Sequence, residues 1–481
     1  MVKIRRIIIL IAFLIVAFLF VFSQAYAYTE ITNCTTITSP GEYRLVNDII
    51  DANVESCIYI QSDNVIFDCQ GHTIDGVGSS SGTTKGIFAY NGVNITVVNC
   101  RFTDWERSVN FYNVINGSIL SSYVDRCYTY DGISLESSSY IRIENVSVSQ
   151  CLFGVVADLS LYTTIHGISC SNVFLCIIFY DSPYGIIYNV NMLDGVRIGI
   201  YALNSSNINI SSIDGYGQSY GIFLRNTSNS IISHSTLRNF YSGIFLEYSF
   251  SNKITNISVV NSSNGILMSS SDFNQINNSV LRDNYCGINI SYSTNNSIFN
   301  NIFNNTNNVC FSETIYYNYW NTSITKGTNI VGGLYIGGNY WGSPDGTGYS
   351  DTCVDANYDG ICDNPYTLAT DNIDYLPLAK YVAPYCGNGI CEPGEDYNTC
   401  PADCPAPTTT TTTIPSYGLI ATARAIARIN PFALFILVLI PVIIGEFVIK
   451  SFEEIKVNEP LKAAIRLLIL IISLALLAAV F

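Results

Sequence analysis

The chain has 481 residues, a formal net charge of −15, and charged side chains at only 12% of its positions. This length allows two or three ordinary domains or one long repeat array. Nucleic-acid binding requires clustered Lys and Arg to neutralise phosphates. This acidic chain has no basic block of that kind, so we expect no nucleic-acid partner.

Residues 1–27 have the pattern of a signal peptide for export. Basic residues begin the segment, an apolar run occupies residues 7–22, and Ala25-Tyr26-Ala27 matches the small-x-small cleavage pattern. An uncleaved signal anchor is the alternative. Cleavage after Ala27 would leave the mature chain outside the cell.

Two further features favour export. The chain has 16 cysteines, an even number, and disulfides are typical of exported proteins. It also carries many Asn-x-Ser/Thr sequons, although a chain rich in Asn and Ser produces some of these by chance. The candidate glycosylation sites are Asn33, Asn94, Asn116, Asn145, Asn204, Asn209, Asn226, Asn256, Asn261, Asn277, Asn289, Asn295, Asn304 and Asn321.

Residues 28–60 are expected to form an N-terminal cap, because the open end of a repeat array must be covered. Cys34 and Cys57 fall in this segment and are a candidate disulfide. Cys69 and Cys100 lie 31 residues apart at similar positions of two neighbouring repeats. The sequence does not decide whether this second pair stacks or forms a disulfide.

Residues 61–338 carry an internal repeat that indicates the fold class. A Gly-Ile or Gly-Val pair, followed by alternating apolar residues, recurs at steps of 21 to 24 residues once degenerate copies are included. Such alternation predicts strands, and about 22 residues suffice for one coil of three short strands. We therefore predict an all-β parallel β-helix solenoid of about 11 coils. The clear copies begin at Gly86, Gly132, Gly154, Gly199, Gly221, Gly243, Gly265 and Gly287.

An asparagine follows the glycine by eight or nine residues in several repeats. Stacked amides can hydrogen-bond along a parallel array, so these residues are predicted to form a ladder at one turn. Ordinary turn propensity of Asn is the alternative. The residues concerned are Asn94, Asn207, Asn229, Asn252, Asn274 and Asn295.

The repeat resembles the right-handed parallel β-helix superfold of pectin lyase-like proteins, and more closely its NosD-like, carbohydrate-associated group. The resemblance covers about residues 28–381 and implies the fold much more than any activity. NosD is associated with copper delivery, which would require clustered His or Met ligands. The three histidines, His72, His166 and His234, lie far apart in the coil order, so we expect no copper site.

Residues 339–381 are expected to form the C-terminal cap, since NosD-like chains commonly end with this kind of tail. The cap contains the pattern D-x-N-x-D-G-x-x-D, in which oxygen ligands at every second residue can converge on calcium. An acidic turn without metal is the alternative, because Tyr366 stands where an EF-hand has its bidentate Glu. Cys353 and Cys362 flank the loop as another candidate disulfide. The candidate calcium ligands are Asp355, Asn357, Asp359 and Asp363.

Residues 382–405 form a small cysteine-rich module similar to the short Cys-Gly-Asn-Gly and Cys-Glu-Pro-Gly-Glu modules of some surface proteins. Two disulfides are expected because so short a segment cannot bury a core. Zinc binding by the same residues is the alternative. The cysteines are Cys386, Cys391, Cys400 and Cys404. Residues 406–420, with six consecutive threonines, are expected to be an extended linker.

Residues 421–481 are predicted to form a transmembrane hairpin of two helices. Two apolar stretches of 19 residues, 431–449 and 463–481, are each just long enough to cross a bilayer. The connection between them carries three lysines, which places it in the cytoplasm. The β-helix would then lie on the extracellular side of the cell membrane.

The candidate catalytic residues are Asp104, Asp125 and Arg126. The two acids are 21 residues apart, so they could meet across stacked coils as a paired-carboxylate site. A column of solvated turn residues is the alternative. The motifs of polygalacturonases and mannuronan epimerases are absent from the sequence.

The composition suits a sugar-binding surface, and a soluble, charge-poor exterior is the alternative interpretation. The chain has 34 tyrosines, and Tyr together with Asn and Ser suits aromatic stacking and amide hydrogen bonds to a glycan. We therefore expect a surface adhesin or polysaccharide-binding scaffold. A polysaccharide-modifying enzyme and a structural component of the cell envelope are the alternatives.

Overall fold

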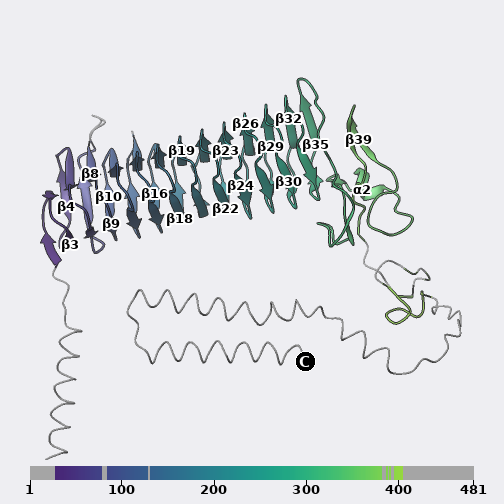
Figure 1. Ribbon diagram of the computed structural model, residues 1–481, viewed down its shortest axis with the longest axis horizontal. Helices are drawn as coiled ribbons and strands as arrows, with labels where there is room; N and C mark the ends of the chain where they lie inside the picture. The colour runs from purple at the N-terminus through teal and green to yellow at the C-terminus, as the bar shows by residue number, and fades with distance from the viewer. Residues whose placement is uncertain are drawn as a thin grey trace, which may run out of the picture. The chain divides into compact units, whose positions relative to one another are not determined.

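A computed structural model describes residues 28–78, 84–127, 130–381, 386–387, 389, 391 and 395–404. The predicted signal peptide, threonine linker and transmembrane hairpin lie outside these residues. Within the described ranges, no helix has both the length and the apolar character that a membrane crossing needs. Strands stacked along one axis make up most of the described chain (Figure 1).

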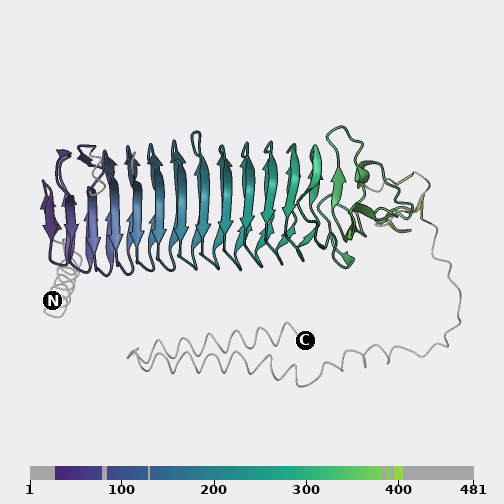
Figure 2. The same ribbon diagram turned by 90° about the horizontal axis from the view of Figure 1, so that it is seen from above.

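The stacked strands form a parallel β-solenoid, which confirms the all-β repeat prediction and the period of about 22 residues. The solenoid has about 12 turns, whereas about 11 were predicted. The difference arises at the N-terminal end, where residues 28–60 also contribute strands to the two main sheets. Seen from above, successive coils follow one another from purple to green (Figure 2).

Sheet B contains one strand from each coil and has 13 strands in the described chain. Every predicted Gly-Ile or Gly-Val pair falls in one of these strands. The strands are β2 (Thr35–Ile37), β5 (Ser56–Ile60), β8 (Lys85–Tyr90), β11 (Arg107–Tyr112), β14 (Asp131–Glu136), β17 (Phe153–Asp158), β19 (Leu175–Tyr180), β21 (Ile198–Leu203), β23 (Tyr220–Arg225), β26 (Ser242–Glu247), β29 (Asn264–Ser269), β32 (Cys286–Ser291) and β35 (Asn307–Ser312).

Sheet A contains the remaining strands of the coils and has 23 strands in the described chain. Most coils supply two short strands to it, which join into one longer strand in the middle of the solenoid. They are β1 (Tyr28–Ile31), β3 (Gly41–Leu45), β4 (Ile49–Ala52), β6 (Val65–Asp68), β7 (Thr73–Gly76), β9 (Ile95–Val98), β10 (Arg101–Thr103), β12 (Ser118–Leu120), β13 (Tyr123–Asp125), β15 (Arg142–Glu144), β16 (Ser147–Ser149), β18 (Thr164–Ser171), β20 (Ile186–Met192), β22 (Asn209–Tyr216), β24 (Ile231–Ser233), β25 (Thr236–Arg238), β27 (Lys253–Thr255), β28 (Ser258–Val260), β30 (Gln275–Asn277), β31 (Val280–Arg282), β33 (Ser297–Phe299), β34 (Ile302–Asn304) and β38 (Tyr340–Gly342).

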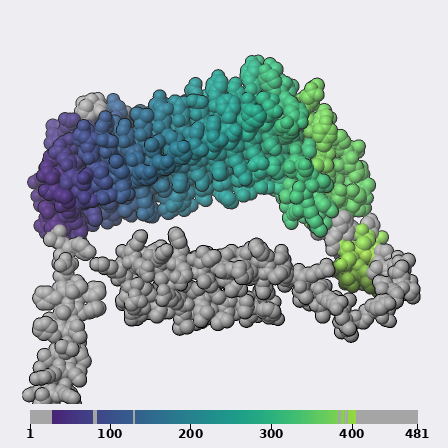
Figure 3. All heavy atoms as spheres, viewed as in Figure 1, coloured from purple at the N-terminus to yellow at the C-terminus, as the bar shows by residue number. Residues whose placement is uncertain are grey.

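The core consists of columns of like side chains, because parallel coils in register place each apolar residue on its counterpart. Ile222 of β23 pairs with Ile244 of β26, and Ile244 pairs with Ile266 of β29. All three side chains are fully buried. On the face seen in Figure 3, the surface of the solenoid continues from one coil to the next. Every second residue of each strand therefore points outward and remains available for function.

The repeated glycine is explained by close packing between coils. A Cβ atom added at Gly221 would lie 2.5 Å from the carbonyl oxygen of Gly243 in the next coil. A Cβ added at Gly265 would lie 2.4 Å from the carbonyl oxygen of Gly287. Such distances are too short for any side chain without backbone movement, so the repeat favours Gly at this position.

The predicted asparagine ladder divides into two columns. Asn94, Asn207, Asn229 and Asn295 occupy a corner with φ between 55° and 60°, a left-handed conformation that Asn tolerates. Asn252 and Asn274 instead belong to a buried ladder that continues through Asn296 and Asn318. The prediction of one column was wrong because both columns are rich in Asn and lie one residue apart in the sequence.

All sixteen cysteines are paired, so disulfide bonding is confirmed and no described cysteine is free to bind zinc as a thiolate. The bonds include Cys34–Cys57, Cys69–Cys100 and Cys353–Cys362. The cysteine-rich module contains Cys386–Cys400 and Cys391–Cys404. Three further bonds were not anticipated from the sequence: Cys127–Cys151, Cys170–Cys176 and Cys286–Cys310.

The C-terminal end of the core is covered by aromatic residues. Trp341 of β38 stacks on Phe303 of the last coil at 4.7 Å between ring centroids, and Trp320 packs beside Trp341. The indole of Trp320 donates a hydrogen bond to Asn372 at 2.9 Å. The remaining elements of this cap are β36 (Thr325–Lys326), β37 (Tyr335–Ile336), α2 (Tyr349–Thr352), β39 (Tyr366–Ala369) and β40 (Asn372–Asp374).

Candidate functional site

The outward face of sheet A is strongly polar in the first third of the solenoid. Strands β7, β10, β13 and β16 run parallel in register, so their outward residues form columns. One column contains Asp75, Thr103, Asp125 and Ser149. Its members are joined by hydrogen bonds, since Thr103 donates to Asp75 and Ser149 donates to Asp125.

The three candidate catalytic residues come together on this face. The Arg126 guanidinium contacts both oxygens of Asp104, at 2.7 to 3.0 Å, and one oxygen of Asp125 at 3.1 Å. Asp125 is only 6% exposed and also accepts hydrogen bonds from Ser149 and Gln150. Stacking of neighbouring coils therefore brings Asp104 and Asp125 to the same arginine, as their spacing in the sequence predicted.

This cluster is better suited to holding coils together than to proton transfer. General acid–base catalysis needs a carboxyl that can reach substrate in a suitable protonation state. Arg126 engages both Asp104 and Asp125, and further donors occupy Asp125. Charge-assisted pairs with an arginine are among the stronger hydrogen bonds in proteins. Both acids are thus engaged by neighbouring side chains of the cluster.

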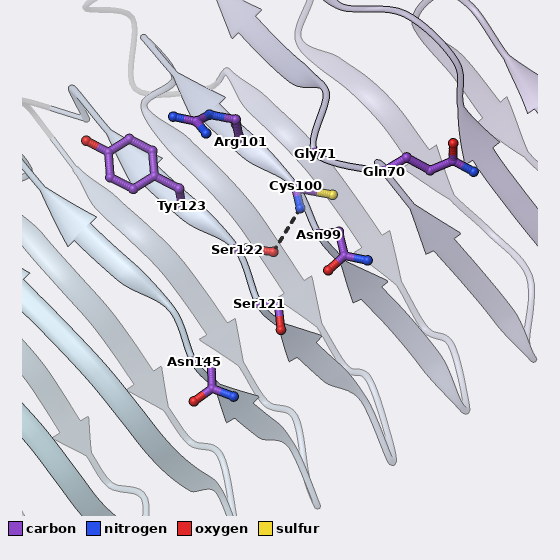
Figure 4. Close-up of a pocket in the computed structure, with 9 residues that line it drawn as sticks. All are labelled: Gln70, Gly71, Asn99, Cys100, Arg101, Ser121, Ser122, Tyr123 and Asn145. Atoms are coloured by element: carbon purple, nitrogen blue, oxygen red, sulfur yellow. Dashed lines mark hydrogen bonds between the residues drawn. The ribbon is translucent and has the colours of Figure 1, made fainter.

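A shallow cavity of about 590 Å³ is lined by residues of two of the same strands, β10 and β13 (Figure 4). Arg101 and Tyr123 stand on the neighbouring strands β10 and β13, with the guanidinium 5.4 Å from the ring centroid. The other lining residues supply amides, hydroxyls and backbone groups, and none of the nine carries a carboxylate. They are Gln70, Gly71, Asn99, Cys100, Ser121, Ser122 and Asn145.

The polar wall of the cavity is built from one corner of successive coils. Gln70, Asn99, Ser121 and Asn145 all have φ between 47° and 55°, which turns the chain sharply at this corner. Their backbone groups bond to the next coil, for example from the Asn99 amide to the Leu120 carbonyl. From the sequence, Asn145 was predicted only as a sequon and Cys100 only as a possible partner of Cys69, and the other lining residues were not predicted as a site. The only available signal was the spacing of the corner residues by roughly one coil.

Arg101 is available to a ligand. No acidic group of the described residues lies within ion-pair distance of its side chain, which stacks only on Tyr123. The Tyr123 hydroxyl lies 3.2 Å from the Ser149 hydroxyl, which links the cavity to the Asp125 column. The site therefore combines an aromatic ring, a cation and several neutral hydrogen-bonding groups.

The predicted calcium loop turns its acids toward its own backbone. The two Asp355 oxygens accept from the Asp359 and Gly360 amides at 3.1 and 2.9 Å, and Asp363 accepts from the Ala356 amide at 3.2 Å. Burial, reinforced by the nearby charges of Asp359 and Asp363, raises the pKa of Asp355. Such an arrangement forms an ordered acidic turn, and calcium binding by this turn stays a prediction.

Calcium should raise the melting temperature of the C-terminal cap if the loop binds it. A ligand at a hundredfold excess over its Kd stabilises the folded state by about 2.7 kcal/mol. Thermal melts followed by tryptophan fluorescence would measure this shift, and Asp359→Asn should abolish it. Asp345→Asn is the matched control, because Asp345 is an acid of the same cap that bonds to Thr347 outside the loop. An equal calcium shift in both variants would contradict the prediction.

The candidate glycosylation sites differ in exposure. Asn94, Asn116, Asn204 and Asn226 are exposed at corners, where a glycan can be accommodated. Asn277 in β30 is only 6% exposed, and its carbonyl oxygen accepts from Thr255. Glycosylation is therefore sterically easier at the corners than at Asn277.

Comparison with solved structures returns β-helix proteins of low similarity. The periplasmic alginate epimerase AlgG is 13% identical, with a TM-score of 0.42 over 55% of this chain and 74% of AlgG. A DFA-IIIase from Arthrobacter chlorophenolicus A6 is 13% identical, with a TM-score of 0.40 over 48% and 71%. A tailspike of E. coli bacteriophage HK620, solved with a hexasaccharide, is 8% identical, with a TM-score of 0.38 over 59% and 71%. No curated protein sequence matches the chain.

One protein-family model, described as periplasmic copper-binding protein (NosD), matches residues 176–346. The histidines of the described residues do not gather into a set of copper ligands. His166 lies against Glu144 and Asn189, whereas His234 lies against Asn256 in a different coil. Among the described residues, the one compact group of potential ligands is Cys386, Cys400 and Asp403, and its cysteines are joined in a disulfide. The chain is therefore a β-solenoid that contains a region similar to the NosD family.

Proposed function

We propose that the chain is an extracellular, membrane-anchored β-helix protein that binds carbohydrate without cleaving it. Eight disulfides belong to an oxidising compartment, either periplasmic or extracellular. The hairpin of residues 421–481 would hold the solenoid at the membrane, and the threonine linker would separate the two. A rigid solenoid at the end of such a linker suits a surface adhesin.

The cavity at β10 and β13 is the observation that carries this proposal. Sugar hydroxyls are recognised by amides, hydroxyls and planar groups, all of which line the cavity. Tyr123 offers an aromatic ring, while Asn99, Ser121 and Asn145 offer hydrogen-bonding side chains at successive coils. Repetition at the coil spacing suits a polymer with repeating hydroxyl groups.

A polysaccharide-modifying enzyme is the second candidate, favoured by the closeness of Asp104 and Asp125. Catalysis would require at least one of these acids to be released from Arg126 when substrate binds, because Arg126 engages both acids in this structure. A purely structural role in the envelope is the third candidate. It requires no ligand in the cavity at all.

The test is retention of a panel of polysaccharides by the purified chain, with the chain length of each polysaccharide measured before and after. Arg101→Ala and Tyr123→Ala should each weaken retention by about tenfold, which corresponds to about 1.4 kcal/mol of binding free energy. Arg225→Ala is the matched control, because Arg225 lies on sheet B and pairs with Glu247 there. Loss of retention in the control alone would place the binding site elsewhere.

A further inference from the structure

A strip of exposed apolar side chains runs along a different corner of the solenoid, where each sheet B strand ends and sheet A begins. The tyrosine strip consists of Ile115, Tyr140, Leu159, Leu161, Tyr162 and Tyr184, whose exposed fractions lie between 40 and 57%. Backbone bridges join Ile115 to Ser139 and Ser139 to Leu161 in successive coils. The strip is therefore continuous over several coils rather than a set of isolated residues.

The whole corner is left-handed, and the strip differs from the other coils in placing tyrosine there in three successive coils. Tyr140, Tyr162 and Tyr184 have φ of 57°, 55° and 63°. Left-handed conformations cost an ordinary L-residue roughly 1–2 kcal/mol, whereas Asn adopts them readily. Other coils of the same chain place Asn at this turn, for example Asn116 and Asn229. Asn would stabilise this turn more than Tyr does. Tyrosines in three successive coils therefore indicate a role at the surface.

The geometry of the rings favours a protein partner over a sugar. Tyr140 stacks on Tyr162 at 4.9 Å and 9°, and Tyr162 stacks on Tyr184 at 5.1 Å and 16°. The ring faces that a sugar would stack upon therefore cover one another, and mainly ring edges point outward. Leu159 and Leu161 add aliphatic surface that offers no hydrogen bonds. Aromatic and aliphatic centres with few charges are typical of the cores of protein interfaces.

Acidic residues border the strip on the side of sheet B. Glu136 and Asp158 are register neighbours on β14 and β17, and Asp181 follows at the end of β19. Within the described chain, neither Asp158 nor Asp181 forms an ion pair. Burial, together with the charges of Glu136 and Asp181, raises the pKa of Asp158. Cationic groups of a partner would relieve this repulsion.

We propose that the tyrosine strip is a docking surface for a different protein, whose contacting segment is extended, apolar and flanked by basic residues. A second copy of this chain fits less well, because its own strip would bring the same carboxylates together. The chain is also poor in cations, with 22 Lys and Arg against 37 Asp and Glu. This surface is separate from the cavity at β10 and β13, so the inference does not rest on carbohydrate binding.

The test uses the purified full-length chain and a synthetic peptide of alternating Leu and Lys, with a Leu and Glu peptide as the charge-reversed probe. The variant is Tyr140→Asn combined with Tyr162→Asn and Tyr184→Asn. It should bind the Leu and Lys peptide at least tenfold more weakly than the native chain. Its melting temperature should be unchanged or higher, because Asn suits the turn. The Leu and Glu peptide should bind neither protein.

Phe273→Asn is the matched control, because Phe273 occupies the same turn with φ of 58° outside the strip. This control should bind the Leu and Lys peptide as the native chain does. Equal binding by the triple variant and the native chain would overturn the proposal. Sedimentation showing a native dimer that the triple variant loses would also overturn it, in favour of a second copy as the occupant.

Discussion

The C-terminal cap is expected to lose stability as the pH rises from about 4 to about 7. Asp374 is fully buried and accepts hydrogen bonds from the Asn339 amide and the Trp341 indole, both at 2.8 Å. Burial raises the pKa of this carboxyl to about 7, although the donors around it oppose the change. The protonated acid is therefore the form that the folded cap favours.

The sign of the effect follows from proton binding. The unfolded chain holds Asp374 at its ordinary pKa of 3.8, so between that pH and about 7 the folded state binds more protons. Stability then falls with rising pH and becomes flat above about 7. The free energy of unfolding falls by about 4 kcal/mol over this pH range, since one pKa unit corresponds to 1.36 kcal/mol.

Denaturant unfolding followed by tryptophan fluorescence reports mainly on this end of the molecule, because Trp320 and Trp341 lie in the cap and only Trp105 lies elsewhere. Asp374→Asn should remove the pH dependence between about 4 and 7. Asp345→Asn is the control and should leave the loss of stability between about pH 4 and 7 unchanged. Asp345 is an exposed acid, and its hydrogen bonds to Thr347 and Ser343 lower its pKa to about 2. Stability that rises over this pH range in the native chain would show that the donors outweigh burial.

Replacing Asn274 by Ala should destabilise the solenoid by roughly 3 kcal/mol. The Asn274 carbonyl oxygen accepts from both the backbone and the side chain of Asn252, and its amide donates to Ser249 and Asn296. All these groups are buried, so the substitution leaves donors and acceptors unpaired. Chemical denaturation followed by circular dichroism would measure the change.

Asn295→Gly is the control for the ladder. Asn295 stands in the neighbouring corner column with φ of 56°, which Gly adopts without strain. The substitution should change stability by only a few tenths of a kcal/mol. Comparable destabilisation by both substitutions would mean that the ladder contributes no more than an ordinary turn.

The repeat was predictable because its physical cause is visible in the sequence. Gly221 lies in close contact with the backbone of the next coil, and Ile222 lies in a fully buried column. Each coil repeats these two environments, so the same residue types recur. The first coils lack this signal. Cys57 stands where later coils have Gly, and Ile58 pairs in register with Ile87. The predicted number of coils was accordingly too small.

The site was less predictable, because it depends on side-chain direction. The period brought Asp104 near Asp125, but it could not show that Arg126 would engage both. Asn99 and Ser121 belong to no sequence motif, and they line the cavity together only because the coils stack. The tyrosines at residues 140, 162 and 184 were counted in the composition, yet their common corner emerged only from the structure.

Carbohydrate binding without cleavage is best tested by measuring retention and chain length on the same polysaccharide samples. At least one polysaccharide should be retained at its original chain length and released when Arg101 or Tyr123 is replaced by Ala. Shortened chains, or products altered by a reaction that Asp125→Asn abolishes, would contradict the claim and identify an enzyme. Absence of retention across the panel would equally contradict it and leave a structural role.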